Sequence, residues 1–221
     1  MRRILLYLLC FLSCVASLSA QSLWKLEGGI HMDKTKDWGK TNSVYFNVGT
    51  EYLDRGWFNL SSNIGILRHG IVFDVTSDAG NIIYDITSSG TFLTLNTIFD
   101  VKKTSSDGYT FYLGAGPKLD VLLASGMYSK YGHSEFDDSY LVDFSPVVFG
   151  MRCELGVKKR FGKATDVGLV VAYQPSFTNI IKHLSAFNQS INVGLTIGYE
   201  FSAGKNTQGE KAAKRTLKLR R

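Results

Sequence analysis

Apolar and polar residues alternate strictly in a stretch near the end of the chain. In Gln189–Phe201, every second residue from Ile191 to Phe201 is large and apolar, and the residues between them are polar or glycine. Side chains of a β-strand point alternately to its two faces, so the stretch predicts a strand with one apolar and one polar face. At roughly 3.3 Å per residue and a tilt of about 40°, about ten such residues would cross the hydrocarbon core of a bilayer.

The same alternation recurs along the chain and predicts about eight strands. They are expected at Trp24–Met32, Val44–Leu53, Phe58–Ile66, Leu93–Val101, Thr110–Leu123, Val147–Lys158, Val167–Gln174 and Gln189–Phe201. The connections alternate between short ones (54–56, 102–108, 159–165) and longer ones (33–42, 69–90, 124–141, 175–188). This pattern is typical of outer-membrane barrels. We therefore expect one all-β domain over residues 21–201, a single antiparallel transmembrane β-barrel. Apolar runs within 69–90 fit a hairpin that extends past the membrane as well as a loop.

Small residues on the polar faces indicate which face points inward. These faces carry ten glycines: Gly29, Gly49, Gly65, Gly114, Gly116, Gly150, Gly156, Gly168, Gly194 and Gly198. Glycine weakens a water-exposed strand without solubilising it, whereas small residues make room inside a narrow barrel. The apolar faces are nearly free of charge, as contact with lipid requires. We therefore favour a membrane barrel, and a secreted soluble barrel of the lipocalin type is the alternative.

The two ends of the chain differ in composition from the predicted barrel. Residues 1–20 combine two arginines, a short apolar run and small residues, the pattern of a secretory signal peptide cleaved after Ala20. Lipid attachment at Cys14 is a weaker alternative. Residues 202–221 contain seven Lys and Arg against one Glu and predict a basic disordered tail in the periplasm. Because this tail carries the positive charge, the basic composition does not indicate a nucleic-acid-binding fold.

Two segments resemble a known family. Residues 91–123, with Tyr-Leu-Gly-Ala-Gly-Pro at 112–117, resemble the middle of the PorT-like outer-membrane β-barrel (porin) family of Bacteroidetes. Residues 173–180 followed by 188–201 resemble its closing segment. The resemblance implies a barrel of about eight strands in the cell outer membrane of a Gram-negative envelope. It implies little about activity, although PorT itself is tied to protein secretion. The terminal aromatic residue used for assembly would be Phe201, yet here twenty residues follow it.

Charged residues on the polar faces would point into the barrel. Three pairs of opposite charge lie two residues apart on single strands, and three further acids join them. The expected interior network contains Lys25, Glu27, Glu51, Asp100, Lys118, Asp120, Arg152, Glu154 and Glu200. Unpaired charges there would be costly, so we expect a paired network, with charged groups that reach water at the barrel mouths as the alternative. About eight strands enclose room only for side chains, so an open pore is not expected.

The candidate chemistry rests on histidines and aspartates that are expected at outer strand ends or in outer loops. These residues are His31, His69, His133, His183, Asp137 and Asp138. Such a set could form a surface metal site or the acid–base groups of a hydrolase. Its spacing matches no metal or Ser/His/acid motif, so we interpret the residues as solvated. We predict no catalytic residue, no cofactor and no metal site.

The sequence therefore predicts a small outer-membrane barrel with a structural or binding role through its outer loops, and neither a general porin nor an enzyme. The expected partners are outer-membrane lipid, the barrel-assembly machinery and an envelope protein, without nucleic acid. The protein is expected to be a monomer. Two alternatives stay open: a component linked to protein secretion, and an outer-membrane hydrolase that uses loop His and Asp residues.

Overall fold

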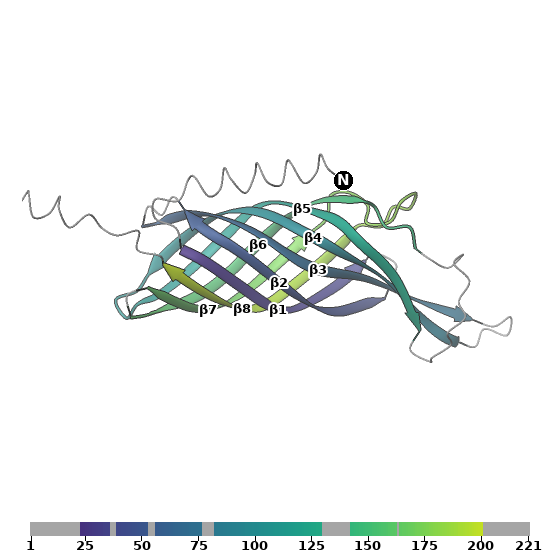
Figure 1. Cartoon of the computed structure of the whole chain (residues 1–221), viewed down its shortest axis with the longest axis horizontal. Coiled ribbons are helices and arrows are strands. Elements are labelled where there is room, and N and C mark those ends of the chain that lie inside the picture. Colours follow the sequence, from purple (N-terminus) through teal and green to yellow (C-terminus); the bar gives the residue numbers. More distant parts are fainter. Residues whose placement is uncertain are drawn as a thin grey trace, which may run out of the picture.

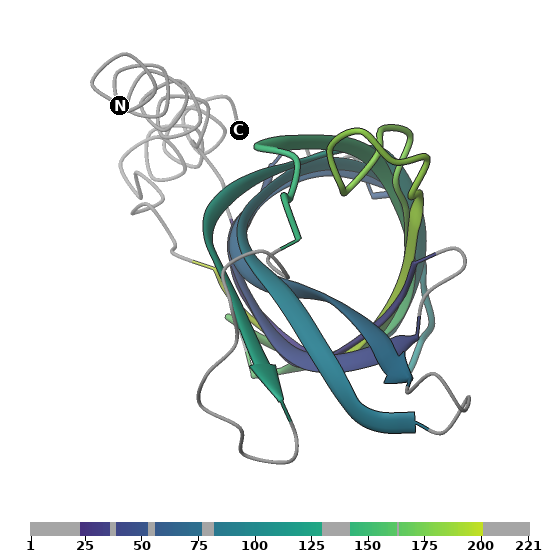
Figure 2. The same cartoon turned by 90° about the vertical axis from the view of Figure 1, so that its right-hand side faces the viewer.

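The chain folds into a closed barrel of eight antiparallel strands (Figures 1 and 2). The computed structural model describes residues 23–35, 39–52, 56–76, 82–129, 142–162 and 164–200. The strands are β1 (Leu23–Thr35), β2 (Lys40–Tyr52), β3 (Phe58–Thr76), β4 (Ile82–Thr104), β5 (Tyr109–Ser129), β6 (Val147–Phe161), β7 (Thr165–Pro175) and β8 (Asn188–Glu200). Each strand pairs with the next, and β1 pairs with β8 to close the sheet. The predicted all-β class and the eight-stranded antiparallel barrel are confirmed.

The barrel has two unlike ends. Strands β1 and β8 begin and end the described chain at one end, where the β2–β3, β4–β5 and β6–β7 connections also lie; we call this the turn end. The four other connections lie at the opposite end, which we call the loop end. No helix in the described part of the chain is long and apolar enough to cross a membrane. The predicted signal peptide (1–20) and basic tail (202–221) lie outside the described residues.

Several strands are longer at the loop end than the sequence pattern predicts. β3 pairs with β4 as far as Thr76 and Ile82, so the segment 69–90 is largely a hairpin, and Figure 1 shows β3, β4 and β5 extending past the other strands. The expected long loop at 33–42 is wrong, because β1 continues to Thr35 and β2 begins at Lys40. The added residues of β1 and β2 are polar on both faces, which hides them from a test based on apolar alternation.

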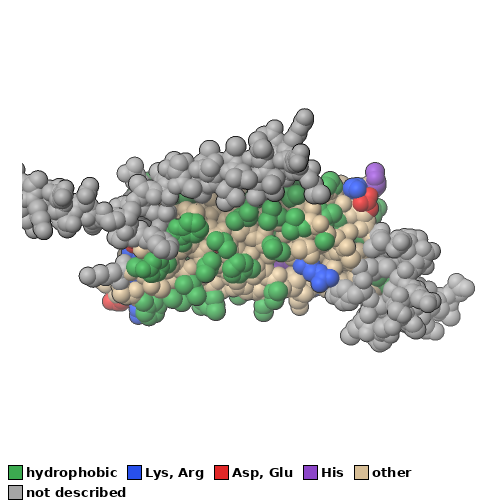
Figure 3. All heavy atoms as spheres, viewed as in Figure 1, with side chains coloured by type: hydrophobic (Ala, Val, Ile, Leu, Met, Phe, Trp, Pro, Cys, Tyr) green, Lys and Arg blue, Asp and Glu red, His purple; other side chains and the backbone are tan. Residues whose placement is uncertain are grey.

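Side chains alternate between the interior and the outer wall as expected. On β1, Lys25, Glu27 and His31 are buried, whereas Leu26 and Ile30 are exposed. The same holds around the barrel, so exposed apolar side chains cover its wall, and charged groups gather toward its ends (Figure 3). Gly156 and Gly194 of the inner face make room for the rings of Tyr112 and Tyr45 respectively, because a Cβ at either glycine would overlap the tyrosine.

An apolar plug fills the interior near the loop end. It consists of the buried side chains of Tyr45, Leu67, Ile71, Phe92, Phe144, Val148, Ile180, Ile181 and Ala186. The β5–β6 and β7–β8 connections complete it, since Phe144 pairs with Ile181 in an isolated β-bridge and Ser145 donates to the carbonyl of Ile180 over 2.8 Å. The ring centroids of Phe92 and Phe144 lie 6.1 Å apart. Loop residues therefore pack onto strand residues inside the barrel.

Candidate functional site

Four charged side chains meet in the middle of the barrel, and we call them the central ion group: Lys25 and Glu27 of β1, and Arg152 and Glu154 of β6. Arg152, which is 0% exposed, donates from Nη2 to Glu27 Oε1 and from Nε to Glu154 Oε2, each over 2.6 Å. Lys25 Nζ lies 3.6 Å from Glu27 Oε2 and 3.5 Å from Glu154 Oε1. Two cations thus balance two anions. The pairs join β1 to β6, which are not neighbours, so they cross the lumen.

A second chain of ion pairs lies at the turn end. Lys158 Nζ lies 2.7 Å from Glu51 Oε2 and 3.8 Å from Asp166 Oδ2. Arg160 Nε lies 2.7 Å from Asp166 Oδ1, and Arg160 Nη1 lies 3.0 Å from Glu200 Oε2. These groups line a cavity of about 410 Å³. Of the expected interior acids, Glu51 and Glu200 therefore lie at this mouth, apart from the central ion group, and their partners Lys158 and Arg160 are absent from the expected set.

The remaining expected residues lie at other depths of the barrel. Lys118 and Asp120 pair within β5, with Nζ 2.7 Å from Oδ2. Asp100 is buried, and its Oδ1 has no hydrogen-bond partner among the described residues. The sequence placed these side chains on the inner face by alternation alone. It missed their distribution over separate levels, because alternation does not report the stagger between strands.

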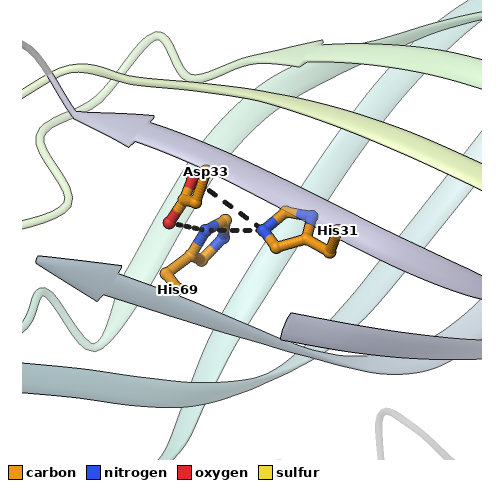
Figure 4. Close-up of side chains that lie close together, drawn as sticks. All are labelled: His31, Asp33 and His69. Carbon is orange, nitrogen blue, oxygen red and sulfur yellow. Dashed lines mark hydrogen bonds and ion pairs between the residues drawn. The ribbon is translucent and has the colours of Figure 1, made fainter. Parts of the chain in front are cut away.

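Between the apolar plug and the central ion group lies a polar cluster, which we call the histidine cluster: His31, Asp33, His69, Asp120, Asn188 and Asn192. His31 Nε2 lies 3.4 Å from His69 Nδ1. The Asp33 carboxylate reaches both rings, with Oδ2 3.0 Å from His69 Nδ1 and Oδ1 3.8 Å from His31 Nε2. Figure 4 shows these three side chains turned toward one another.

Residues of β5 and β8 complete the histidine cluster. Asn192 Oδ1 lies 2.6 Å from His31 Nδ1, and Asn188 Nδ2 lies 2.9 Å from His69 Nδ1. Asp120 Oδ2 lies 3.4 Å from His69 Nε2. In the described part of the chain, His31, Asp33 and His69 form the one group of His, Cys, Asp and Glu side chains whose donor atoms lie close enough to share a metal ion.

The interpretation of His31 and His69 as solvated residues is wrong. They are 0% and 1% exposed and point into the barrel. Both strands continue beyond their predicted ends, and His31 keeps the inward direction of Lys25 and Glu27. That shared alternation was the signal that could have placed His31 inside. His183 is exposed in the β7–β8 connection, whereas His133, Asp137 and Asp138 lie outside the described residues.

Comparisons with known proteins show similarity of fold. Neisserial surface protein A (NspA) matches with a TM-score of 0.53 at 10% sequence identity, over 81% of this chain and 97% of that one. The outer membrane protein OprG from Pseudomonas aeruginosa matches with a TM-score of 0.49 at 14% identity, over 82% of this chain and 97% of that one. Ail, the attachment invasion locus protein of Yersinia pestis, was solved with the heparin analogue sucrose octasulfate. It matches with a TM-score of 0.43 at 16% identity, over 82% of this chain and 99% of that one. No family model and no curated protein matches the sequence.

Proposed function

We propose that this protein is a closed outer-membrane barrel that holds a structural or binding surface at the cell exterior and does not act as a general porin. The observation that carries this proposal is the filled interior. Buried ion pairs cross the lumen at mid-height, and the apolar plug occupies the loop end. A barrel of eight strands has room only for such side chains.

The outer wall supports a place in a membrane. Large apolar side chains point outward around the barrel, with Val44 79% and Leu155 59% exposed. Soluble monomers rarely expose contiguous apolar patches larger than a few hundred Å². A lipid environment removes this surface from water, whereas a secreted soluble barrel would leave it exposed. The loop end then faces the exterior and the turn end faces the periplasm, as in other barrels of this kind.

The first test is location and folding. Cell fractionation should recover the protein with the outer membrane, and unboiled protein should migrate differently from boiled protein on a gel. Recovery as a freely soluble periplasmic protein would refute the membrane assignment.

The second test is conductance. Because the lumen is filled, planar-bilayer recordings of the purified protein should show no steady large channel. A reproducible, water-filled conductance of the unaltered protein would show that the interior opens in a membrane. It would refute the closed barrel even if the location were correct.

The binding surface is expected on the β3–β4–β5 extension. β3 and β4 stay paired through this extension as far as Thr76 and Ile82, so this part is a sheet that projects from the barrel at the loop end (Figure 1). The resemblance to PorT-like proteins supports a related role, that of a component linked to protein secretion. Extraction in mild detergent followed by affinity purification separates the two roles, because a secretion component should retain a stable envelope protein partner.

A further inference from the structure

We propose that His31, Asp33 and His69 bind one divalent transition-metal ion of the zinc class inside the barrel. This inference is independent of the conductance and location proposed above. His31 Nε2 and His69 Nδ1 are 3.4 Å apart. Asp33 Oδ2 lies 3.0 Å from His69 Nδ1, and Asp33 Oδ1 lies 3.8 Å from His31 Nε2. Zinc–nitrogen and zinc–oxygen bonds of about 2.0–2.1 Å in a tetrahedral site separate the ligand atoms by about 3.3 Å. The two ring nitrogens therefore stand at this spacing, and the Asp33 carboxylate lies close enough to both rings to share the ion with them.

Surrounding groups orient both rings for this role. Asn192 Oδ1 accepts the hydrogen on His31 Nδ1 over 2.6 Å, which leaves the lone pair on Nε2. The Asp120 carboxylate accepts the hydrogen on His69 Nε2 over 3.4 Å, which leaves the lone pair on Nδ1. The two nitrogens that carry these lone pairs lie 3.4 Å apart beside the Asp33 carboxylate. A ligating histidine whose other nitrogen donates to a carboxylate or amide oxygen is a recurring feature of metal sites.

With a neutral His69 and the Asn188 amide as placed, the contacts among the protein atoms alone are not mutually satisfied. His69 Nδ1 faces a carboxylate oxygen of Asp33 at 3.0 Å and the Asn188 side-chain nitrogen at 2.9 Å, although a ring nitrogen either donates or accepts. Asp33 Oδ1 is buried and has no hydrogen-bond partner among the described residues. A cation between the three side chains would satisfy both lone pairs and this oxygen. With its amide turned, Asn188 would offer an oxygen as the fourth ligand.

The donor set and the surroundings indicate the class of ion and its role. Two imidazoles and a carboxylate suit Zn²⁺ and its neighbours, whereas Ca²⁺ and Mg²⁺ prefer oxygen ligands alone. The Phe92 ring of the apolar plug lies 5.1 Å from the His69 ring, and the cavity beside His69 and Asn188, about 10 Å³, has room for no more than about one water. So enclosed an ion would be structural. It would tie β1 to β3, which are not neighbours in the sheet. The competing explanation is a proton on His69 Nδ1, which would make it an imidazolium between Asp33 and Asp120.

Zinc loading of the whole, untagged chain distinguishes these explanations. Protein refolded in detergent without metal is given Zn²⁺, freed of excess ion and analysed for zinc. We expect about one ion per chain and a higher temperature of unfolding, because an ion that binds only the folded state stabilises it. Asp33→Asn, which keeps the shape of the side chain, and His69→Gln should lose the ion. His183→Gln, at an exposed histidine of the loop end, is the matched control and should keep it.

A second variant and a second probe protect the test against misfolding. Asn192→Ala removes an orienting contact without removing a ligand and should weaken zinc binding by about tenfold or more. Co²⁺ bound to the unaltered protein should give the intense visible absorption of a four-coordinate ion. The proposal is overturned if the folded protein retains no zinc, if Asp33→Asn binds zinc as well as the unaltered protein, or if His183→Gln removes the ion.

Discussion

At the scale of single residues, Arg152 has the largest expected effect on stability. Replacing it by alanine leaves Glu27 and Glu154 buried without the cation that both contact over 2.6 Å. Breaking a buried ion pair in this way costs about 3–5 kcal/mol. Arg152→Ala should therefore lower the free energy of unfolding by that amount in denaturant titrations of the refolded barrel. Leu155→Val, on the outward face of the same strand, removes one methylene and should cost about 1 kcal/mol or less.

A compensated variant tests whether charge or packing is responsible. Arg152→Met combined with Glu27→Gln leaves Lys25 and Glu154, which lie 3.5 Å apart, as a balanced pair. We expect this double variant to be more stable than Arg152→Met alone, because no buried carboxylate then lacks a cation. Equal free energies of unfolding for the two would contradict an electrostatic origin.

Individual residues also show what the sequence can and cannot predict. Alternation placed Arg152 and Glu27 on the inner face, because the side-chain period of a strand is independent of its surroundings. It did not predict that they pair with each other, since that depends on which strands face one another across the lumen. The histidine cluster was missed for a similar reason. His31 and His69 are 38 positions apart and meet through tertiary structure alone.

At the scale of strands, the contact between β1 and β8 depends on two glycines. Gly29 and Gly194 lie opposite each other, and a Cβ at Gly29 would overlap the carbonyl oxygen of Val193 and lie 2.5 Å from Gly194 Cα. At the adjacent Gly28, the nearest atom to a Cβ would be the Tyr45 carbonyl oxygen at 3.5 Å, an ordinary contact.

Alanine substitutions at these two neighbours should therefore differ. Gly29→Ala should destabilise the barrel by about 1–3 kcal/mol, the usual range for overpacking, and lower the yield of the folded band in unboiled samples. Gly28→Ala, the matched control, should fold as the unaltered protein does. The same loss in both variants would show that backbone flexibility, and not crowding between β1 and β8, requires glycine here.

Strand ends were harder to predict than strand existence. A register shift between Thr91 and Phe92 interrupts the ladder of β4 with β5, because Leu123 of β5 is an extra residue without a partner in this ladder. The predicted fourth strand began at Leu93, just past this irregularity. The five residues before it, Thr-Ser-Ser-Gly-Thr at 87–91, are polar or glycine and carry no apolar period, although β4 continues through them to Ile82.

At the scale of the whole molecule, the described barrel is complete without the basic segment 202–221. The strand pairing that closes the barrel joins residues Leu23–Thr35 of β1 to residues Asn188–Glu200 of β8. Deleting 202–221 should therefore leave the unboiled gel band and the free energy of unfolding unchanged. A truncated chain that no longer reaches the folded state would assign this segment a part in assembly.

The closed eight-stranded architecture was predictable, whereas the filling of its loop end was not. An even number of amphipathic strands with alternating connection lengths leads to closure. Phe144, Ile180 and Ile181 lie in connections, where no periodicity marks an inward side chain. Their burial depends on how two connections pack together, and the sequence pattern contains no signal for that.

The pairing of β1 with β8 also imposes an order in time. Leu23 leaves the ribosome long before Glu200, its partner in the sheet. Every other strand can pair with the one made just before it, but the open edge of β1 waits for the end of the barrel to be synthesised. An unpaired strand edge is a template for aggregation. This edge must therefore be shielded until the last strand is available, and the step that completes the barrel joins the oldest strand to the youngest.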